Sequence, residues 1–251
     1  MINKKMCILI LSFVFAVIMI AVGFFALTVN DISVDFTMCD SDDTQVLKVK
    51  EELKVFEGRN LLFVDKEDVV SVIEKDPYLE CISVEKKFPG TVNIVVVERR
   101  EAYITTFGEK TYLLDQTGFV LSEYVGDGRR DLITLNFIGV TVQSVNVGEY
   151  ISTDLDQNLR TSFEIAKSVN LTDCIKVMTV ENKVIQTDVI FDTYTNVKIR
   201  IVDCGVKGIE KAQKAFNVYD TEEKDYIKSF NELQAYLKDG EPVAVWTRYS
   251  A

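Results

Sequence analysis

The first pattern along the chain is an uninterrupted apolar run, because no charged residue occurs from Met6 to Asn30. At 1.5 Å per residue, a helix of this length can cross the roughly 30 Å hydrocarbon core of a bilayer. A secretory signal has a shorter apolar region and a small-residue cleavage site, and Ala26-Leu27-Thr28 is a poor site of that kind. The pattern therefore predicts an uncleaved transmembrane helix over residues 6–30.

The charges beside this run predict its orientation. Lys4 and Lys5 precede it, and only aspartates follow it closely. Positive charge stays on the cytoplasmic side of a membrane. Residues 1–5 should therefore form a short cytoplasmic tail, with everything after Asn30 outside. The aspartates are Asp31, Asp35, Asp40, Asp42 and Asp43.

Residues 31–100 show the periodicities of a small α+β domain, in the order β-α-α-β-β. Apolar residues alternate weakly from Val29 to Phe36, as in a strand, and a helical stripe follows from Thr44 to Phe56. Gly58 is placed to end that helix as a C-cap. The helical stripe consists of Val46, Val49 and Leu53.

A second helix and a hairpin complete this domain. Asp65 is placed as an N-cap, and Pro77 ends the helix because the residue before proline avoids helical geometry. Two strands then flank a turn at residues 88–90 (Phe-Pro-Gly). The buried faces are expected to be Val69, Val72 and Ile73 in the helix, Ile82 and Val84 in the first strand, and Val92, Ile94 and Val96 in the second.

After residue 100 the chain changes to short strands separated by turns, with two amphipathic helices among them. The helices are predicted over Thr153–Val169, with Ser152 or Thr153 as its cap, and over Ile209–Val218. Strands are predicted over residues 102–106, 111–114, 119–121, 132–137, 177–180, 183–190 and 196–202.

The C-terminal part ends in a further helix and a strand. Residues 222–237 have apolar side chains at helical spacing, which predicts an extra helix, and Pro242–Tyr249 (PVAVWTRY) reads as the last strand. The stripe of the extra helix is Tyr226, Phe230, Leu233 and Leu237. The two outer domains are expected to meet near Glu101, which gives a domain at 31–100 and a β-rich domain with flanking helices at 101–251.

Four short motifs then appear in a fixed order behind the single predicted span. In this order they resemble the POTRA domain of the FtsQ/DivIB family of bacterial cell-division proteins. The resemblance runs from about Val29 to Leu121, and residues 112–121 (YLLDQTGFVL) are similar to the start of the family's second, β-rich domain. The motifs are Gly58-x-Asn60-Leu61-Leu62-x-Val64-Asp65, Asp76-Pro77-Tyr78, residues 84–91 (VEKKFPGT), and residues 97–100 (VERR) followed by Ala102.

Composition removes several function classes. The net charge of −11 argues against nucleic acid and against peripheral attachment to anionic lipid, which both need a positive surface. The chain has no histidine, which removes Ser-His and Cys-His nucleophiles. No phosphate-binding loop, EF-hand or C-x-x-C pair is present. We therefore expect no catalytic residue, cofactor, metal or small-molecule substrate. Disulfides are not predicted for the scattered Cys39, Cys81, Cys174 and Cys204, which read as small hydrophobes.

Two features suggest protein binding. The last strand is apolar at Val243 and Val245 and carries the only tryptophan, Trp246. A terminal strand is often a sheet edge that can accept another chain's strand, and tryptophan is enriched at interface hot spots. Packing of Trp246 in the core remains an equal alternative. Ile209 and Phe216, on the helix predicted over Ile209–Val218, are the other candidates.

The family resemblance implies the rest of the reading. It implies a non-enzymatic divisome scaffold at the septum that binds bitopic coiled-coil proteins of the FtsL/DivIC (FtsB) type and helps regulate septal peptidoglycan synthesis. It also implies that Glu98 and Arg99 lie at the interdomain junction, where they would pair. The extra predicted helix departs from the family pattern. The alternatives are a POTRA-containing secretion or envelope-assembly accessory protein and an exported cell-wall enzyme using two carboxylates.

Overall fold

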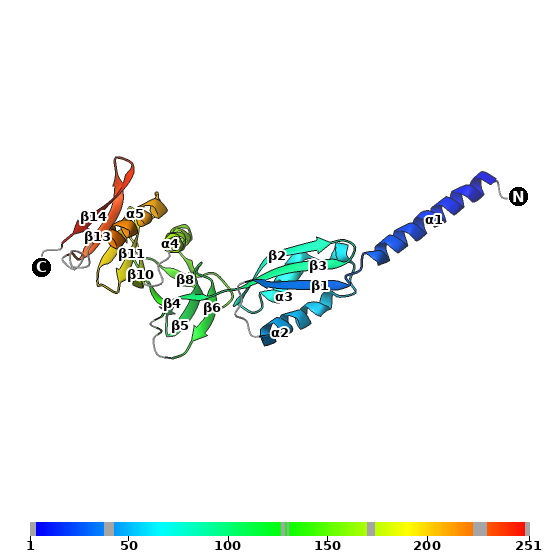
Figure 1. Cartoon of the computed structure of the whole chain (residues 1–251), viewed down its shortest axis with the longest axis horizontal. Helices are drawn as coiled ribbons and strands as arrows, with labels where there is room; N and C mark the ends of the chain where they lie inside the picture. The colour runs from blue at the N-terminus through cyan, green and yellow to red at the C-terminus, as the bar shows by residue number, and fades with distance from the viewer. Residues whose placement is uncertain are drawn as a thin grey trace. The chain divides into compact units, whose positions relative to one another are not determined.

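The computed structural model describes residues 4–37, 43–126, 129, 131–169, 174–222 and 230–248. By its internal contacts the chain divides into two compact units, Met1–Arg99 and Arg100–Ala251. The division lies next to the boundary expected between residues 100 and 101. Figure 1 shows that the first unit contains α1, α2 and α3 and a small sheet, whereas the second is built on a large sheet.

Helix α1 (Lys4–Ala26) coincides with most of the apolar run. Its described leucine and phenylalanine side chains are largely exposed, including Leu11 at 72% and Phe13 at 69%. In the part of the chain that the structure describes, no helix is both long and apolar enough to cross a membrane. The transmembrane helix expected over residues 6–30 is not confirmed and stays a prediction.

Besides α1, the first unit has a three-stranded sheet with two helices and two 3-10 turns. The strand order is β1-β3-β2, with β1 parallel and β2 antiparallel to the central β3. This is the predicted β-α-α-β-β order, read along the chain. The elements are β1 (Asp31–Thr37), α2 (Asp43–Leu53), η1 (Lys54–Phe56), η2 (Leu61–Phe63), α3 (Lys66–Ile73), β2 (Leu79–Lys87) and β3 (Thr91–Glu98).

The buried faces of this unit follow from its periodicity. Val92, Ile94 and Val96 alternate on β3 and are each at most 1% exposed, because the central strand lies against the helices. The Asp65 carboxylate accepts from the Glu67 N–H at 3.1 Å, so the predicted N-cap of α3 is confirmed. On β2 the prediction was partly wrong. A bulge between Cys81 and Ser83 shifts the alternation, and Ile82 is 55% exposed.

The second unit is organised on a nine-stranded mixed sheet in the order β14-β13-β12-β11-β10-β7-β4-β5-β6. A short ribbon of β8 and β9 lies outside it. The strands are β4 (Glu101–Phe107), β5 (Lys110–Asp115), β6 (Val120–Tyr124), β7 (Ile133–Ile138), β8 (Val142–Ser144), β9 (Ser152–Thr153), β10 (Ile175–Asn182), β11 (Thr187–Thr193), β12 (Lys198–Ile201), β13 (Glu232–Lys238) and β14 (Glu241–Thr247).

Two helices share one core with this sheet, α4 (Asp156–Ser168) and α5 (Gly208–Thr221). The side chains of β11 show how the core is divided. Phe191 is fully buried and meets Phe216 of α5 edge-on, with ring centroids 5.7 Å apart. Asp188 and Ile190 occupy the alternate positions of β11. Their side chains therefore belong to the opposite face of the sheet from Phe191. The predicted start of α4 at Thr153 was three residues early, because the Thr153 hydroxyl instead accepts from the Leu155 N–H in a turn.

The extra helix predicted over residues 222–237 is wrong from Glu232 onwards, where the chain forms β13. Leu233 and Leu237 fit both a helical stripe and a strand alternation, and pairing with β12 and β14 decides for the strand. The overlooked signal was Asp239-Gly240, with φ of 54° and 83°. Two residues with positive φ between apolar segments make the tight turn of a β-hairpin. Residues 223–229, including Tyr226, lie outside the described part.

Candidate functional site

Strand β14 forms one edge of the nine-stranded sheet, as the strand-addition prediction requires. It pairs with β13 alone, in an antiparallel register from Glu232 opposite Thr247 to Lys238 opposite Glu241. The other long side of β14 therefore has no strand against it among the described residues. An edge of this kind presents backbone N–H and C=O groups to solvent.

The tight turn indicates which residues present these groups. Residues flanking a two-residue hairpin turn exchange hydrogen bonds, and bonded and non-bonded pairs then alternate along the ladder. Lys238 and Glu241 flank the turn. Counting from them, the backbone groups of Ala244 and Trp246 point away from β13. Pro242, which has no N–H, also falls at an outward position, which agrees with this register.

The side chains of β14 separate onto two faces. Trp246 and Ala244 lie opposite Leu233 and Ala235, and all four belong to the core packing. The indole ring lies 5.4 Å from the Phe230 ring, and its buried N–H has no hydrogen-bond partner in the described structure. The alternative that Trp246 packs in the core is the one the structure favours.

Val243 and Val245 take the other face of β14, beside Tyr236 and Gln234 of β13. Val245 is 42% exposed, so this face is accessible. The three β14 residues predicted to bind a partner thus lie on one strand without forming one surface. Val243 and Val245 offer their side chains to a partner on this face, whereas Trp246 offers only its backbone N–H and C=O groups at the edge.

The two candidates on α5 support this strand from the core side. Phe216 is 6% exposed and packs on Phe191, and Ile209 is partly buried against the same core. Lys211, on the same helix, is 1% exposed, and its ammonium donates to the carbonyls of Val202 and Asp203. Burial lowers the pKa of Lys211. Phe216 therefore packs in the core of the second unit, where a partner would not contact it.

A buried charge cluster connects the edge hairpin to the sheet. Arg200 of β12 lies 2.6 Å from Glu232 of β13, 3.0 Å from Asp188 of β11 and 2.5 Å from Glu181 of β10. One guanidinium thus spans four neighbouring strands. Lys183 adds a 2.7 Å contact to Asp188. Sequence reasoning missed this cluster, because its members are far apart in the chain.

Electrostatics in this cluster favour the ionised forms. Burial alone would raise the pKa of Asp188, but hydrogen bonds from Lys183, the Asp203 N–H and Arg200 outweigh it and lower that pKa. The Arg200 hydrogen bond likewise lowers the pKa of Glu181. Burial would lower the pKa of Arg200, yet its carboxylate partners raise it. The cluster therefore stays charged at neutral pH.

The predicted junction residues have separate partners. Arg99 is 8% exposed, and its guanidinium lies 3.5 Å from the Glu80 carboxylate. The backbone N–H of Arg99 donates to the Tyr78 carbonyl at 2.7 Å. Glu98 lies opposite Leu79 in the β2–β3 ladder. The structure thus gives Arg99 an ion pair with Glu80, and a junction role for Glu98 and Arg99 stays a prediction.

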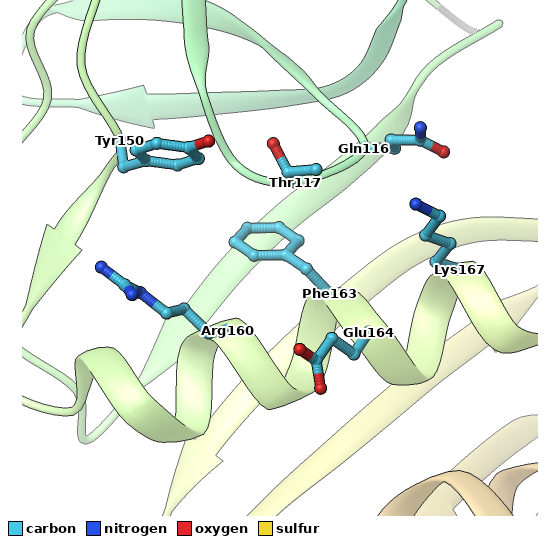
Figure 2. Close-up of a pocket in the computed structure, with 7 residues that line it drawn as sticks. All are labelled: Gln116, Thr117, Tyr150, Arg160, Phe163, Glu164 and Lys167. Atoms are coloured by element: carbon cyan, nitrogen blue, oxygen red, sulfur yellow. The ribbon is translucent and has the colours of Figure 1, made fainter. Parts of the chain in front are cut away.

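A cleft of about 370 Å³ lies beside α4 and was not predicted from the sequence. Figure 2 shows the Phe163 ring between the helix and the loop that carries Gln116 and Thr117, with Arg160 and Lys167 to either side. Its lining has one carboxylate, that of Glu164, so the cleft lacks the pair of carboxylates that glycoside hydrolysis uses. The lining residues are Gln116, Thr117, Tyr150, Arg160, Phe163, Glu164 and Lys167.

The cysteine thiols and the acidic side chains show no arrangement for catalysis or metal binding in the described part of the chain. Burial raises the pKa of the free Cys81 and Cys204 thiols to about 11, which disfavours the nucleophilic thiolate. Cys174 is half-buried, and Cys39 lies outside the described residues. Within the described ranges, no three histidine, cysteine, aspartate or glutamate side chains gather to hold a metal ion.

Comparison with known proteins finds a family model that matches within the first unit and several cell-division proteins that match part of the chain. The family described as "POTRA domain, FtsQ-type" matches residues 41–99. "Cell division protein DivIB" of Clostridium acetobutylicum is 29% identical over 104 residues, which is 41% of each chain. "Cell division protein FtsQ" of Geobacter sp. (strain M21) is 35% identical over 74 residues, 30% of this chain and 27% of the relative. The match therefore spans less than half the length of these relatives. The resemblance to the FtsQ/DivIB family is confirmed.

Proposed function

We propose that this chain is a non-enzymatic scaffold of the bacterial cell-division machinery, which uses the β14 edge to bind partners of the FtsL/DivIC (FtsB) type at the septum. The names of the relatives and the FtsQ-type POTRA match support a role in division. The observation that carries the binding proposal is that, among the residues described, no strand pairs with the outer side of β14 at the edge of the nine-stranded sheet. Through these partners the scaffold would help regulate septal peptidoglycan synthesis.

The proposal includes a membrane anchor at the N-terminus. Its support is the absence of charge from Met6 to Asn30 and the placement of lysines before and aspartates after this run. The anchor would hold both outer units on the extracytoplasmic side. It would also restrict the search for bitopic partners to the plane of the membrane.

The binding step would be strand addition. An extended partner segment would pair with the outward backbone groups of Ala244 and Trp246, which gives affinity without demanding particular side chains. Specificity would come from the exposed Val243 and Val245 face. Because Ala244 and Trp246 pack against the core, the edge is already in place before a partner arrives, which reduces the ordering cost of binding.

The test is an Ala244→Pro substitution in the full-length protein. Proline removes the outward N–H, whereas the bonds from β14 to β13 belong to neighbouring residues, and proline is tolerated on an edge strand when its missing N–H faces solvent. We expect at least a tenfold loss of affinity for a reconstituted FtsL/DivIC-type complex. The measurement is a binding titration in detergent or nanodiscs.

The matched control is Ala244→Val, which adds two carbons at the same position, as proline does, and keeps the N–H. It should bind within a few-fold of the parent, and both variants should unfold near the parent's midpoint. Parent-like binding by a folded Ala244→Pro variant would move the partner site away from this edge.

A further inference from the structure

The end of the POTRA unit next to α1 carries an exposed apolar surface. Leu62 and Phe63 of η2 are 54% and 73% exposed, and Phe88, in the β2–β3 turn, is 65% exposed. We call these three side chains the collar. The Lys86 ammonium donates to the Leu62 carbonyl at 3.4 Å, which places the end of β2 beside η2.

The collar is built around the segment that follows α1. The Leu61 N–H donates to the Leu27 carbonyl at 2.6 Å, and the Asn30 N–H donates to the Gly90 carbonyl at 2.8 Å. Helix α1 ends at Ala26, so the collar segments contact the first residues after it. At Gly90 an added Cβ would overlap the Thr28 carbonyl, so this approach is close and specific.

Basic side chains accompany the collar. Arg59 lies over the Phe56 ring at 5.2 Å, and Lys86 and Lys87 precede Phe88 directly. Glu57 is the acidic residue nearest to Arg59 in the sequence. Asp65 and Glu85 are further acidic neighbours in the sequence, so both signs of charge occur around the collar. Phenylalanine and leucine flanked by lysine and arginine are the composition of surfaces that lie in the membrane interface.

We propose that the collar rests in the interfacial layer of the lipid bilayer and fixes the POTRA unit against the membrane surface. This inference rests on the proposed membrane anchor, because α1 would bring the collar to the bilayer. Three side chains are few beside the 20–30 residues per partner of a stable protein interface. A surface already tethered to a membrane needs no such area, so lipid is the occupant that fits.

The test uses tryptophan fluorescence of the full chain in phosphatidylcholine vesicles with brominated acyl chains, which quench nearby indoles. Phe63→Trp and Phe88→Trp are made separately in a Trp246→Phe background. We expect both to lose emission in brominated vesicles compared with unbrominated ones. Circular dichroism checks that each variant is folded.

Two further variants separate the possible outcomes. Ile82→Trp is the matched control, because Ile82 is similarly exposed on the same strand but five residues from Lys87, roughly 16 Å away. It should keep its emission. Phe15→Trp, in the middle of α1, should be strongly quenched if the anchor exists.

If Phe15→Trp is quenched and neither collar variant is, the collar inference falls and the anchor stands. If Phe15→Trp is not quenched, the anchor itself falls and takes the inference with it. Equal quenching of Ile82→Trp and the collar variants would show non-specific adsorption and would also overturn the inference. Emission of the collar variants that changes only when division partners are added would make this a protein-binding surface instead.

Discussion

At one edge of the nine-stranded sheet the chain returns to cover β6, whereas at the other edge β14 is left uncovered within the described structure. The Val120 N–H donates to the Glu149 carbonyl, and the Gly148 N–H donates to the Val120 carbonyl, each at 2.9 Å. The Phe119 and Tyr150 rings meet edge-on beside these bonds, 5.1 Å apart. A short segment thus satisfies the start of β6 where another chain could otherwise pair.

The difference shows that the two edges of one sheet are protected from strand pairing to different degrees. Uncovered edges invite unwanted pairing, and proteins commonly cover, charge or shorten them. Here the β6 edge is covered at its start, and the β14 edge is seven residues long and apolar at Val243 and Val245. A long, apolar edge strand without a neighbouring strand can pair with a strand of a specific partner. The comparison therefore supports the proposed function.

The two edges also differ in how their ion pairs are buried, and this difference gives the largest expected effect. Arg200 is 16% exposed and contacts Asp188 and Glu232, which are 0% and 2% exposed. Replacing it as Arg200→Met removes the cation that Asp188 and Glu232 share inside the protein, which should lower the free energy of unfolding of the second unit by about 3 kcal/mol. Denaturant titration of the purified protein measures this.

The control for Arg200→Met lies near the covered edge. Lys110 and Glu123 form a 2.7 Å ion pair between β5 and β6, but both side chains are well exposed. Lys110→Met should leave the unfolding midpoint almost unchanged, since solvent screens such pairs. If the two substitutions proved equally mild, the charge cluster would not be what holds the β13–β14 hairpin to the sheet.

The next largest effect tests the covered edge. Gly118, in the turn between β5 and β6, has φ +85°, and an added Cβ would overlap the Phe163 ring. Gly118→Ala therefore combines backbone strain with a clash in the core, and we expect a loss of about 2 kcal/mol in stability. The comparison is Gly108→Ala, where φ is +64° and the space is empty. Equal losses would mean that strain alone matters and that the ring tolerates the methyl group.

Much of the first unit could be predicted from the sequence, because local rules and tertiary packing agree there. The alternation of Val92, Ile94 and Val96 and the cap at Asp65 both describe what the structure contains. Ile82 is the exception, since a bulge cannot be read from alternation alone. Most of the family motifs also lie in this unit, which is where the family model matches.

The candidate site was less accessible to sequence reasoning. Leu233 and Leu237 are spaced four residues apart, which suits one helical face and also one strand face, so the Asp239-Gly240 turn had to decide between them. The strand at the end of the chain could be predicted. The inward side chain of Trp246 could not, because it depends on the pairing register with β13.

The smallest effect is on pH dependence, and it separates charge from packing at the uncovered edge. In the folded protein the pKa values of Glu181 and Asp188 are lowered by their cationic partners. A carboxyl whose pKa is depressed on folding adds stability above its unfolded pKa, about 4, and loses it as pH falls through the folded value. In Arg200→Met that depression is weakened, and burial pushes the pKa of Asp188 upwards. The gap in unfolding free energy between parent and variant should therefore be wide at pH 7 and narrow at pH 3. A gap that stays constant across this range would assign the role of Arg200 to packing of its aliphatic stem against neighbouring strands.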